Sequence, residues 1–199
     1  NIMTLSYGDN PTLSLEGKRY CFYSLFAGCE SLTSAPTLPA ETLAANCYAS
    51  MFNSCSSLSK APKLPAMKMT EACYTYMFNG CIELAEAPAL PATALADYCY
   101  EAMFNSCVSL TEAPDLPATT LSSRCYYYMF SGCSGLTKAP ALPAKTMIYY
   151  CYYNMFNGCS GLTEAPELPA TPPAGDRPSC AYPADQSAGT VLGVPWSRS

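Results

Sequence analysis

Cysteine is the residue type in this 199-residue chain whose number and spacing most readily suggest chemistry. Twelve of the thirteen cysteines fall into two series that share one 26-residue period, and the second series follows eight residues behind the first. The first series is Cys21, Cys47, Cys73, Cys99, Cys125 and Cys151, and the second is Cys29, Cys55, Cys81, Cys107, Cys133 and Cys159. Thiolates bind soft metal ions and act as nucleophiles. The chain, however, has no histidine to activate a nucleophile, and this spacing is not that of a zinc finger. We therefore predict no catalytic residue, no metal site and no cofactor.

Disulfide bonding is the other chemistry open to these cysteines. The two cysteines of one unit would be about 12 Å apart if the chain between them were helical, whereas a disulfide needs Cα atoms within about 4.4–6.8 Å. Reduced cysteine also packs as a small hydrophobic residue and is often buried. We predict two ladders of buried thiols, with Cys180 outside both.

Charged side chains recur at one position of the repeat and form a second candidate site. They are Lys60, Glu86, Glu112, Lys138 and Glu164, with Lys63 and Asp115 three residues further along their own units. Neighbouring carboxylates such as Glu86 and Glu112 have the chemistry to bind calcium or to act as an acid and base pair. A solvated surface stripe of mixed sign explains the same residues more simply, and we favour it. These seven side chains are the first candidate face for binding a protein.

Tyrosine is the third residue type with a pattern. One aromatic column directly follows the first cysteine series, at Phe22, Tyr48, Tyr74, Tyr100, Tyr126 and Tyr152. Its constancy favours packing over recognition. Other tyrosines change from unit to unit, and those of the last two units are Tyr127, Tyr128, Tyr149, Tyr150 and Tyr153. Tyrosine is enriched at protein interfaces, so this group is the second candidate binding face, although partial burial between units would explain it too.

The elements that position these side chains are predicted to be a helix and an extended segment in each unit. Leu121, Cys125 and Met129 are four residues apart, and their apolar neighbours widen the stripe, which favours a helix of about ten residues. Thr42, Thr120 and Thr146 are suited to cap the helix starts. Pairs such as Asn79-Gly80 are suited to a left-handed turn at the helix ends.

The rest of each unit contains two prolines, such as Pro140 and Pro143, which exclude a long central strand. We expect very short parallel strands around Leu-Thr-x-Ala, followed by a polyproline-like segment. Because a fixed period of this length is typical of solenoids, the predicted fold class is an α/β solenoid. It would be a right-handed leucine-rich-repeat coil of about six 26-residue units, with strands on one side and helices on the other. The predicted divisions are an N-terminal strand and cap at 1–19, the solenoid at 20–170 and an irregular proline-rich tail at 171–199.

The unit also resembles a known family. Its pattern Leu-Thr-x-Ala-Pro-x-Leu-Pro-Ala-x-x-Leu-x-x-x-Cys-Tyr-x-x-Met-Phe-x-x-Cys is similar to the BspA-like leucine-rich repeats of bacterial surface proteins, in which an Ala-Phe-x-x-Cys core precedes the strand. Met51-Phe52 with Cys55 and Met103-Phe104 with Cys107 carry the resemblance, which covers roughly residues 1 to 170. It implies a surface-exposed or anchored protein that takes part in adhesion.

Charge and hydropathy limit the classes of partner that we expect this chain to bind. A net charge of -5 and a pI near 4.6 argue against nucleic acid, and the longest apolar run, Met147 to Tyr153, is too short to enter a membrane as a span. The chain begins at Asn1, which suggests a piece of a longer protein. We predict a non-enzymatic protein at the cell surface or outside the cell, anchored through a part absent from this chain, that binds extracellular host or bacterial surface proteins. The alternative is a structural spacer with no ligand of its own.

Overall fold

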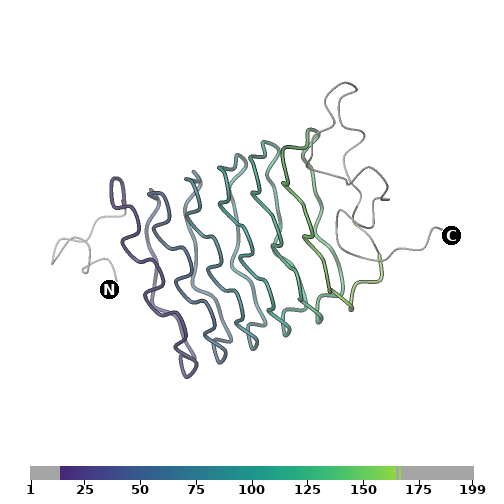
Figure 1. The fold of residues 1–199 in the computed structure, drawn as a ribbon, viewed down its shortest axis with the longest axis horizontal. Helices are drawn as coiled ribbons and strands as arrows, with labels where there is room; N and C mark the ends of the chain where they lie inside the picture. Colours follow the sequence, from purple (N-terminus) through teal and green to yellow (C-terminus); the bar gives the residue numbers. More distant parts are fainter. Residues whose placement is uncertain (1–13, 165, 167–199) are drawn as a thin grey trace.

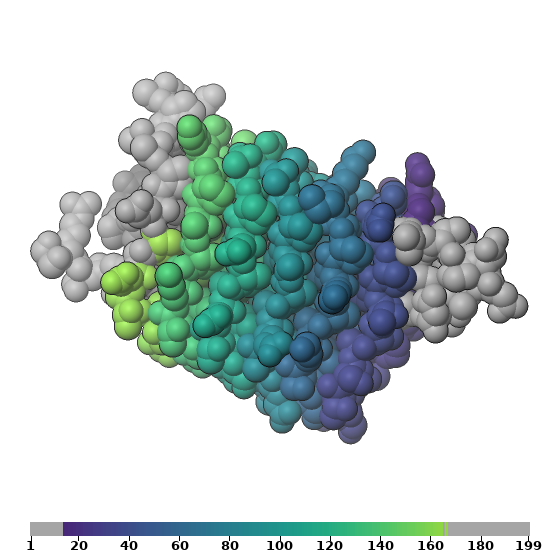
Figure 2. Space-filling model, turned by 180° about the vertical axis from the view of Figure 1, so that it is seen from behind, coloured from purple at the N-terminus to yellow at the C-terminus, as the bar shows by residue number. Residues whose placement is uncertain are grey.

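The computed structural model describes residues 14–164 and residue 166, and they form a repeat solenoid. Successive coils stack along one axis in chain order, each one repeat unit further along the sequence than the last (Figure 1). In space-filling view the coils form bands that follow one another across the surface (Figure 2). Each coil therefore packs against the coils before and after it, as solenoid units do.

One side of each coil is a run of ten residues made entirely of consecutive tight turns. These turn runs are residues 19–28, 45–54, 71–80, 97–106, 123–132 and 149–158. Their backbone N–H groups alternate between two kinds of acceptor. The N–H of Met51 donates to the Tyr48 carbonyl three residues earlier at 3.2 Å, whereas the N–H of Phe52 donates to the Met77 carbonyl of the next coil at 2.9 Å. Half of the amides in a turn run thus hold neighbouring coils together.

The predicted helices are therefore wrong: the described residues contain no helix. Beyond its first turn an α-helix bonds its amides within itself, and packed helices need about 8–10 Å between their axes. Here the stacked rings of neighbouring coils have centroids only 5.6–6.0 Å apart, and helices do not fit at that spacing. A flatter chain fits at this spacing, and half of its amide N–H groups donate hydrogen bonds to the next coil.

Every fourth residue of a turn run has a positive φ, which gives the run its period of four. In run 45–54 these residues are Asn46, Ser50 and Ser54, with φ of 57°, 55° and 60°. The predicted left-handed positions at the ends of the runs are confirmed, since Gly80, Gly132 and Gly158 have φ between 73° and 77°. They close a turn run, however, and not a helix. The threonines have no helix to cap, and Thr42 and Thr120 instead form parallel bridges with Ser14 and Ala94.

The other side of each coil is an extended, proline-containing segment. Within the described residues, neighbouring segments pair only as isolated parallel bridges, which include Lys60 with Glu86 and Glu112 with Lys138. The parallel, in-register pairing agrees with the prediction, but continuous strands are absent from this part of the chain. The two prolines of each segment explain this, because proline has no amide hydrogen to donate.

The core consists of side-chain ladders that run along the solenoid axis. The constant aromatic column is buried and stacked, with rings tilted by at most 11° from one coil to the next. A second ladder, Phe26, Phe52, Phe78, Phe104, Phe130 and Phe156, has the same arrangement with centroids 5.6–5.7 Å apart. The prediction that the constant column serves packing is confirmed.

The cysteines form the two predicted ladders as thiols. Ten are buried, but Cys21 is half-buried and Cys29 is exposed, so the prediction that all twelve are buried is wrong for the first coil. The second ladder has a role that spacing did not indicate. Each thiol from Cys55 onward donates to a phenylalanine carbonyl of the preceding coil, and the Cys107 Sγ lies 3.1 Å from the Phe78 oxygen.

Some predictions lie outside the described residues. They are the strand expected before residue 14, the tail at 171–199 and the state of Cys180. In the part of the chain that is described, no helix has the length and apolar character needed to cross a membrane.

Candidate binding surfaces

The tyrosine cluster is formed by five predicted residues on the turn-run side of the last two coils: Tyr127, Tyr128, Tyr149, Tyr150 and Tyr153. Turn runs hold two successive residues of every four inside the coil and turn the next two outward. Cys125 and Tyr126 are therefore buried, whereas Tyr127 and Tyr128 are partly exposed. The 26-residue register then places the outward residues of the two coils side by side.

The five rings are in direct contact with one another. Tyr127 and Tyr128 pack edge to face at 4.6 Å between centroids, and Tyr127 stacks on Tyr153 at 5.3 Å. Tyr149 meets Tyr150 at 4.1 Å, and Tyr150 meets Tyr153 at 5.0 Å. Tyr149 is the most exposed member, with 42% of its surface accessible. Such ring contacts hold the side chains in one arrangement.

Arg124 lies among these rings and is the main cation of the surface. Its guanidinium carbon is 5.7 Å from the ring centre of Tyr98, 5.2 Å from that of Tyr127 and 5.4 Å from that of Tyr150. The Nε atom is buried and has no hydrogen-bond partner among the described residues. Among the described residues, no carboxylate forms an ion pair with this guanidinium, so its close contacts are with the faces of rings.

Glu101 lies beside this cluster in the preceding coil, near the charge of Arg124. Only 9% of its surface is accessible, and burial raises the pKa of its carboxyl, although Arg124 and the Tyr76 hydroxyl oppose the rise. The Tyr76 hydroxyl donates to Glu101 Oε1 at 3.4 Å, and the Asn154 side-chain amide donates to the Tyr128 hydroxyl at 2.8 Å. The second bond holds Tyr128 of the cluster to the last coil, and the first joins two coils beside the cluster.

The charged candidates lie on the opposite, extended side of the coils. Lys60 Nζ and Glu86 Oε2 form an ion pair at 3.2 Å, but both side chains are more than 70% exposed, so the pair adds little stability. Glu112 and Lys138 are in-register neighbours through their backbone bridge. Asp115, Lys138 and Glu164 are exposed. In the described residues no group of three or more His, Cys, Asp or Glu side chains is arranged to hold a metal ion.

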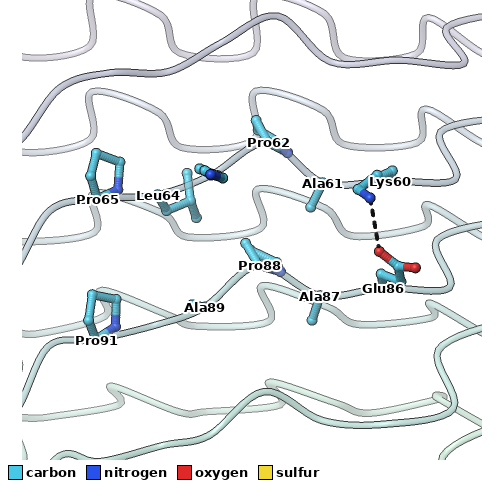
Figure 3. A pocket seen from close by; sticks show the side chains of 11 residues that line it. Lys60, Ala61, Pro62, Leu64, Pro65, Glu86, Ala87, Pro88, Ala89 and Pro91 are labelled. Atoms are coloured by element: carbon cyan, nitrogen blue, oxygen red, sulfur yellow. Dashed lines mark ion pairs between the residues drawn. The ribbon is translucent and has the colours of Figure 1, made fainter.

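Two shallow grooves run between the extended segments on this side. The larger, of about 420 Å³, lies between the segments at 60–65 and 86–91 and is lined mainly by proline, alanine and leucine. Figure 3 shows Pro62 above Pro88 and Pro65 above Pro91, with the Lys60–Glu86 pair at one end. Lys63 also lines this groove. A second groove of about 320 Å³ continues to the next coil, where Glu86, Glu112 and Pro114 line it.

The structure thus brings the predicted tyrosines together and spreads the predicted charges along a stripe. Sequence reasoning did not place Arg124 at the centre of the cluster, and it missed Glu101. A signal was present: Arg124 stands one repeat period from both Tyr98 and Tyr150, and Glu101 stands one period before Tyr127. The shared register brings these columns side by side, but it does not tell which of them face outward.

No protein-family model and no curated protein matches this sequence. Two solved structures are similar to it. One is a leucine-rich repeat protein from Bacteroides ovatus ATCC 8483, with 21% identity and a TM-score of 0.43, covering 70% of this chain and 32% of that protein. The other is the leucine-rich repeat protein TpLRR of T. pallidum, with 20% identity and a TM-score of 0.35, covering 69% of each chain.

This chain spans about a third of the length of the Bacteroides ovatus protein. Likenesses of this strength do not assign the chain to a family. The coils, ladders and register described above establish a repeat solenoid on their own.

Proposed function

We propose that this chain is a non-enzymatic protein-binding solenoid of the leucine-rich-repeat kind, and that it acts in adhesion as part of a bacterial surface protein. The observation that carries the proposal is the division between constant and variable aromatic residues. Constant rings fill the core, whereas the variable tyrosines gather around Arg124 on the outside. Rigid tyrosines beside an arginine are the composition of interface hot spots.

The BspA-like pattern of the repeat supports the surface and adhesion part of this proposal. Proteins with that pattern are surface-exposed, and the resemblance extends through every unit from Cys21 to Cys159. Partners would be extracellular host proteins or proteins of other bacterial surfaces, bound without nucleic acid or membrane insertion.

The test is a binding panel with two variants of matched design. Each substitution introduces the residue that another coil has at the equivalent position, so the introduced residue is compatible with the fold. The cluster variant carries Tyr127→Ala, Tyr149→Ser, Tyr150→Asn and Tyr153→Thr, after Ala49, Ser123, Asn46 and Thr75. The control variant, on the extended side, carries Lys60→Ser and Lys63→Ala, after Ser34 and Ala89.

Both variants and the wild-type chain would be titrated against purified extracellular-matrix proteins and purified bacterial surface proteins. We expect the cluster variant to lose at least about tenfold in affinity for the protein that binds, since hot-spot side chains each contribute about 2 kcal/mol or more. The control variant should bind like the wild type. Loss in the control variant alone would move the binding face to the extended side.

A structural spacer is the second candidate. The unbroken ladders of rings and backbone hydrogen bonds along the axis favour it, because they would make the solenoid stiff. A wild-type chain that is folded but binds no protein in the panel would favour the spacer.

A further inference from the structure

Arg124 carries a guanidinium that forms no ion pair with a carboxylate among the described residues. A guanidinium carries five N–H donors and forms its strongest hydrogen bonds with carboxylates. Within the described part of the chain, the buried Nε has no hydrogen-bond partner, and the close contacts of the guanidinium are with rings. Two carboxylates of the preceding coil are already engaged. The charge of Arg124 lowers the pKa of the Glu101 carboxyl, but Glu101 accepts a hydrogen bond from the Tyr76 hydroxyl. No ion pair joins Glu101 to Arg124 among the described residues.

Asp97 is the second of these carboxylates. It accepts from the Ser122 hydroxyl and, at 2.9 Å, from the Ser123 amide. The tyrosine cluster is thus a ring-lined surface whose arginine forms no ion pair within the described residues.

The opposite, extended side of the coils carries carboxylates that could pair with the guanidinium of Arg124. Glu112 and Asp115 are exposed, and within the described residues neither forms an ion pair. They stand in the segment Glu112-Ala-Pro-Asp-Leu-Pro, an extended stretch whose prolines alternate with carboxylates. Beside Glu112 and Pro114 runs the groove of about 320 Å³. This side therefore offers carboxylates, accessible proline rings and a depression that a ring can enter.

We propose that the tyrosine cluster docks on the extended side of a second copy of this chain. Arg124 of one copy pairs with Glu112 and Asp115 of the next, and the tyrosine rings pack on Pro114 and Pro117. Aromatic surfaces bind extended proline-containing segments in this way because such segments are already ordered. Tyr149, the most exposed ring of the cluster, lies against the groove. The second copy is the occupant that both charge complementarity and ring chemistry indicate.

The two surfaces lie on opposite sides of the coil, which fixes the kind of assembly. A contact between two different surfaces leaves one of each unused at the ends, so it does not close into a dimer. The chain would instead associate into open stacks that grow with concentration. This inference rests on the proposed function of the tyrosine cluster as a binding surface, and it adds the identity of one partner.

Charge reversal with mixing tests the proposal. One variant is Arg124→Glu. The other is Glu112→Lys with Asp115→Lys, which places lysine where Lys60 and Lys63 stand in an earlier coil. Each variant alone would face like charge across the contact and should associate at least about tenfold more weakly than wild type in sedimentation velocity. An equimolar mixture presents opposite charges at both kinds of contact and should recover the association of the wild-type chain.

Arg124→Asn, after Asn46 in an earlier coil, serves as a neutral variant in case Arg124→Glu does not fold, and it should weaken association in the same direction. Wild-type chain that stays monomeric over the full concentration range overturns the proposal, as does association that neither reversal changes. If the wild-type chain is monomeric and the cluster variant still loses binding in the protein panel, the proposal that a second copy is the partner is wrong. The proposed function then stands.

Discussion

The thiols of the second cysteine ladder act as hydrogen-bond donors, and this explains cysteine at a position where another small hydrophobic residue would fill the space. Cys107 Sγ donates to the Phe78 carbonyl at 3.1 Å, and the same carbonyl accepts the N–H of Cys81 at 3.1 Å. Each thiol bond links a coil to the one before it. Alanine at this position would remove the donor and leave a small void.

We predict that Cys107→Ala lowers the free energy of unfolding by about 1–2 kcal/mol, from the lost hydrogen bond and the void. Cys29→Ala is the matched control, because Cys29 is exposed at the corresponding position of the first coil. It should change stability by less than about 0.5 kcal/mol. Urea unfolding of both variants measures the difference, and equal losses would show that the thiol bond contributes nothing.

At the scale of the element, the turn run is stable although φ becomes positive every fourth residue, even where the residue is not glycine. A side chain in this conformation costs about 1–2 kcal/mol, and the runs accept that cost at Ser50 and Ala102, for example. The hydrogen bonds between coils offset it. Both glycine and residues with a side chain occur at such positions. Ser54 has a φ of 60°, and glycine stands at the same position of other coils in Gly80, Gly132 and Gly158.

We predict that Ser54→Gly leaves stability unchanged or raises it by up to about 1 kcal/mol, because glycine adopts positive φ without steric cost. Ser54→Val should lower it by at least about 1 kcal/mol, since a β-branched side chain fits this conformation worst. Thermal unfolding compares the two. A helical run would give the opposite order, because glycine is unfavourable inside a helix.

The period of the repeat, the buried columns and the side-by-side tyrosines could be predicted from the sequence, because a fixed 26-residue register brings equal positions together whatever the local backbone is. The turn runs could not be predicted from the sequence. Cys47, Met51 and Cys55 recur at intervals of four, which fits both a helical stripe and a chain of period four. Only the narrow spacing of coils decides between them, and that spacing is a tertiary property.

Arg124 is the only arginine at its position of the repeat, but its place at the centre of the cluster could not be predicted from the sequence. Its contacts come from Tyr98, Tyr127 and Tyr150, in three different coils. Predicting them requires knowing that the outward residues of a turn run come in pairs. In a helix of about 3.6 residues per turn, the outward face would have drifted by about 40° with every four residues.

At the scale of the whole molecule, the buried ladders couple stability to alkaline pH. Burial raises the pKa of Cys73 and Cys125 to about 12 from 9.0, and the pKa of the buried Tyr74 rises well above 10.0 for the same reason. In the unfolded chain these groups lose their protons near their ordinary pKa values, while in the folded chain they keep them. Unfolding therefore releases protons above about pH 9, so stability falls as pH rises from there towards 12.

We predict that the free energy of unfolding, measured by urea unfolding, is constant from about pH 7 to pH 8. Above about pH 9 it falls steeply, by about 1.4 kcal/mol per pH unit for each buried thiol involved, and the urea midpoint falls with it. Cys73→Ala should make the slope shallower by one thiol, and Cys29→Ala, at an exposed position, should leave it unchanged. A midpoint that does not fall between pH 9 and pH 11 would contradict the buried, protonated ladders.

The central claim for the molecule is that side chains which vary between coils carry recognition on the turn-run side, while the constant ones build the stack. Site-specific photo-crosslinking tests it most directly. A photoreactive phenylalanine analogue would replace either Tyr149 in the cluster or Lys63 on the extended side, and both chains would be irradiated with the protein from the panel that binds. The account predicts an adduct through position 149 and little or none through position 63. An adduct that forms through position 63 and not through position 149 would contradict it.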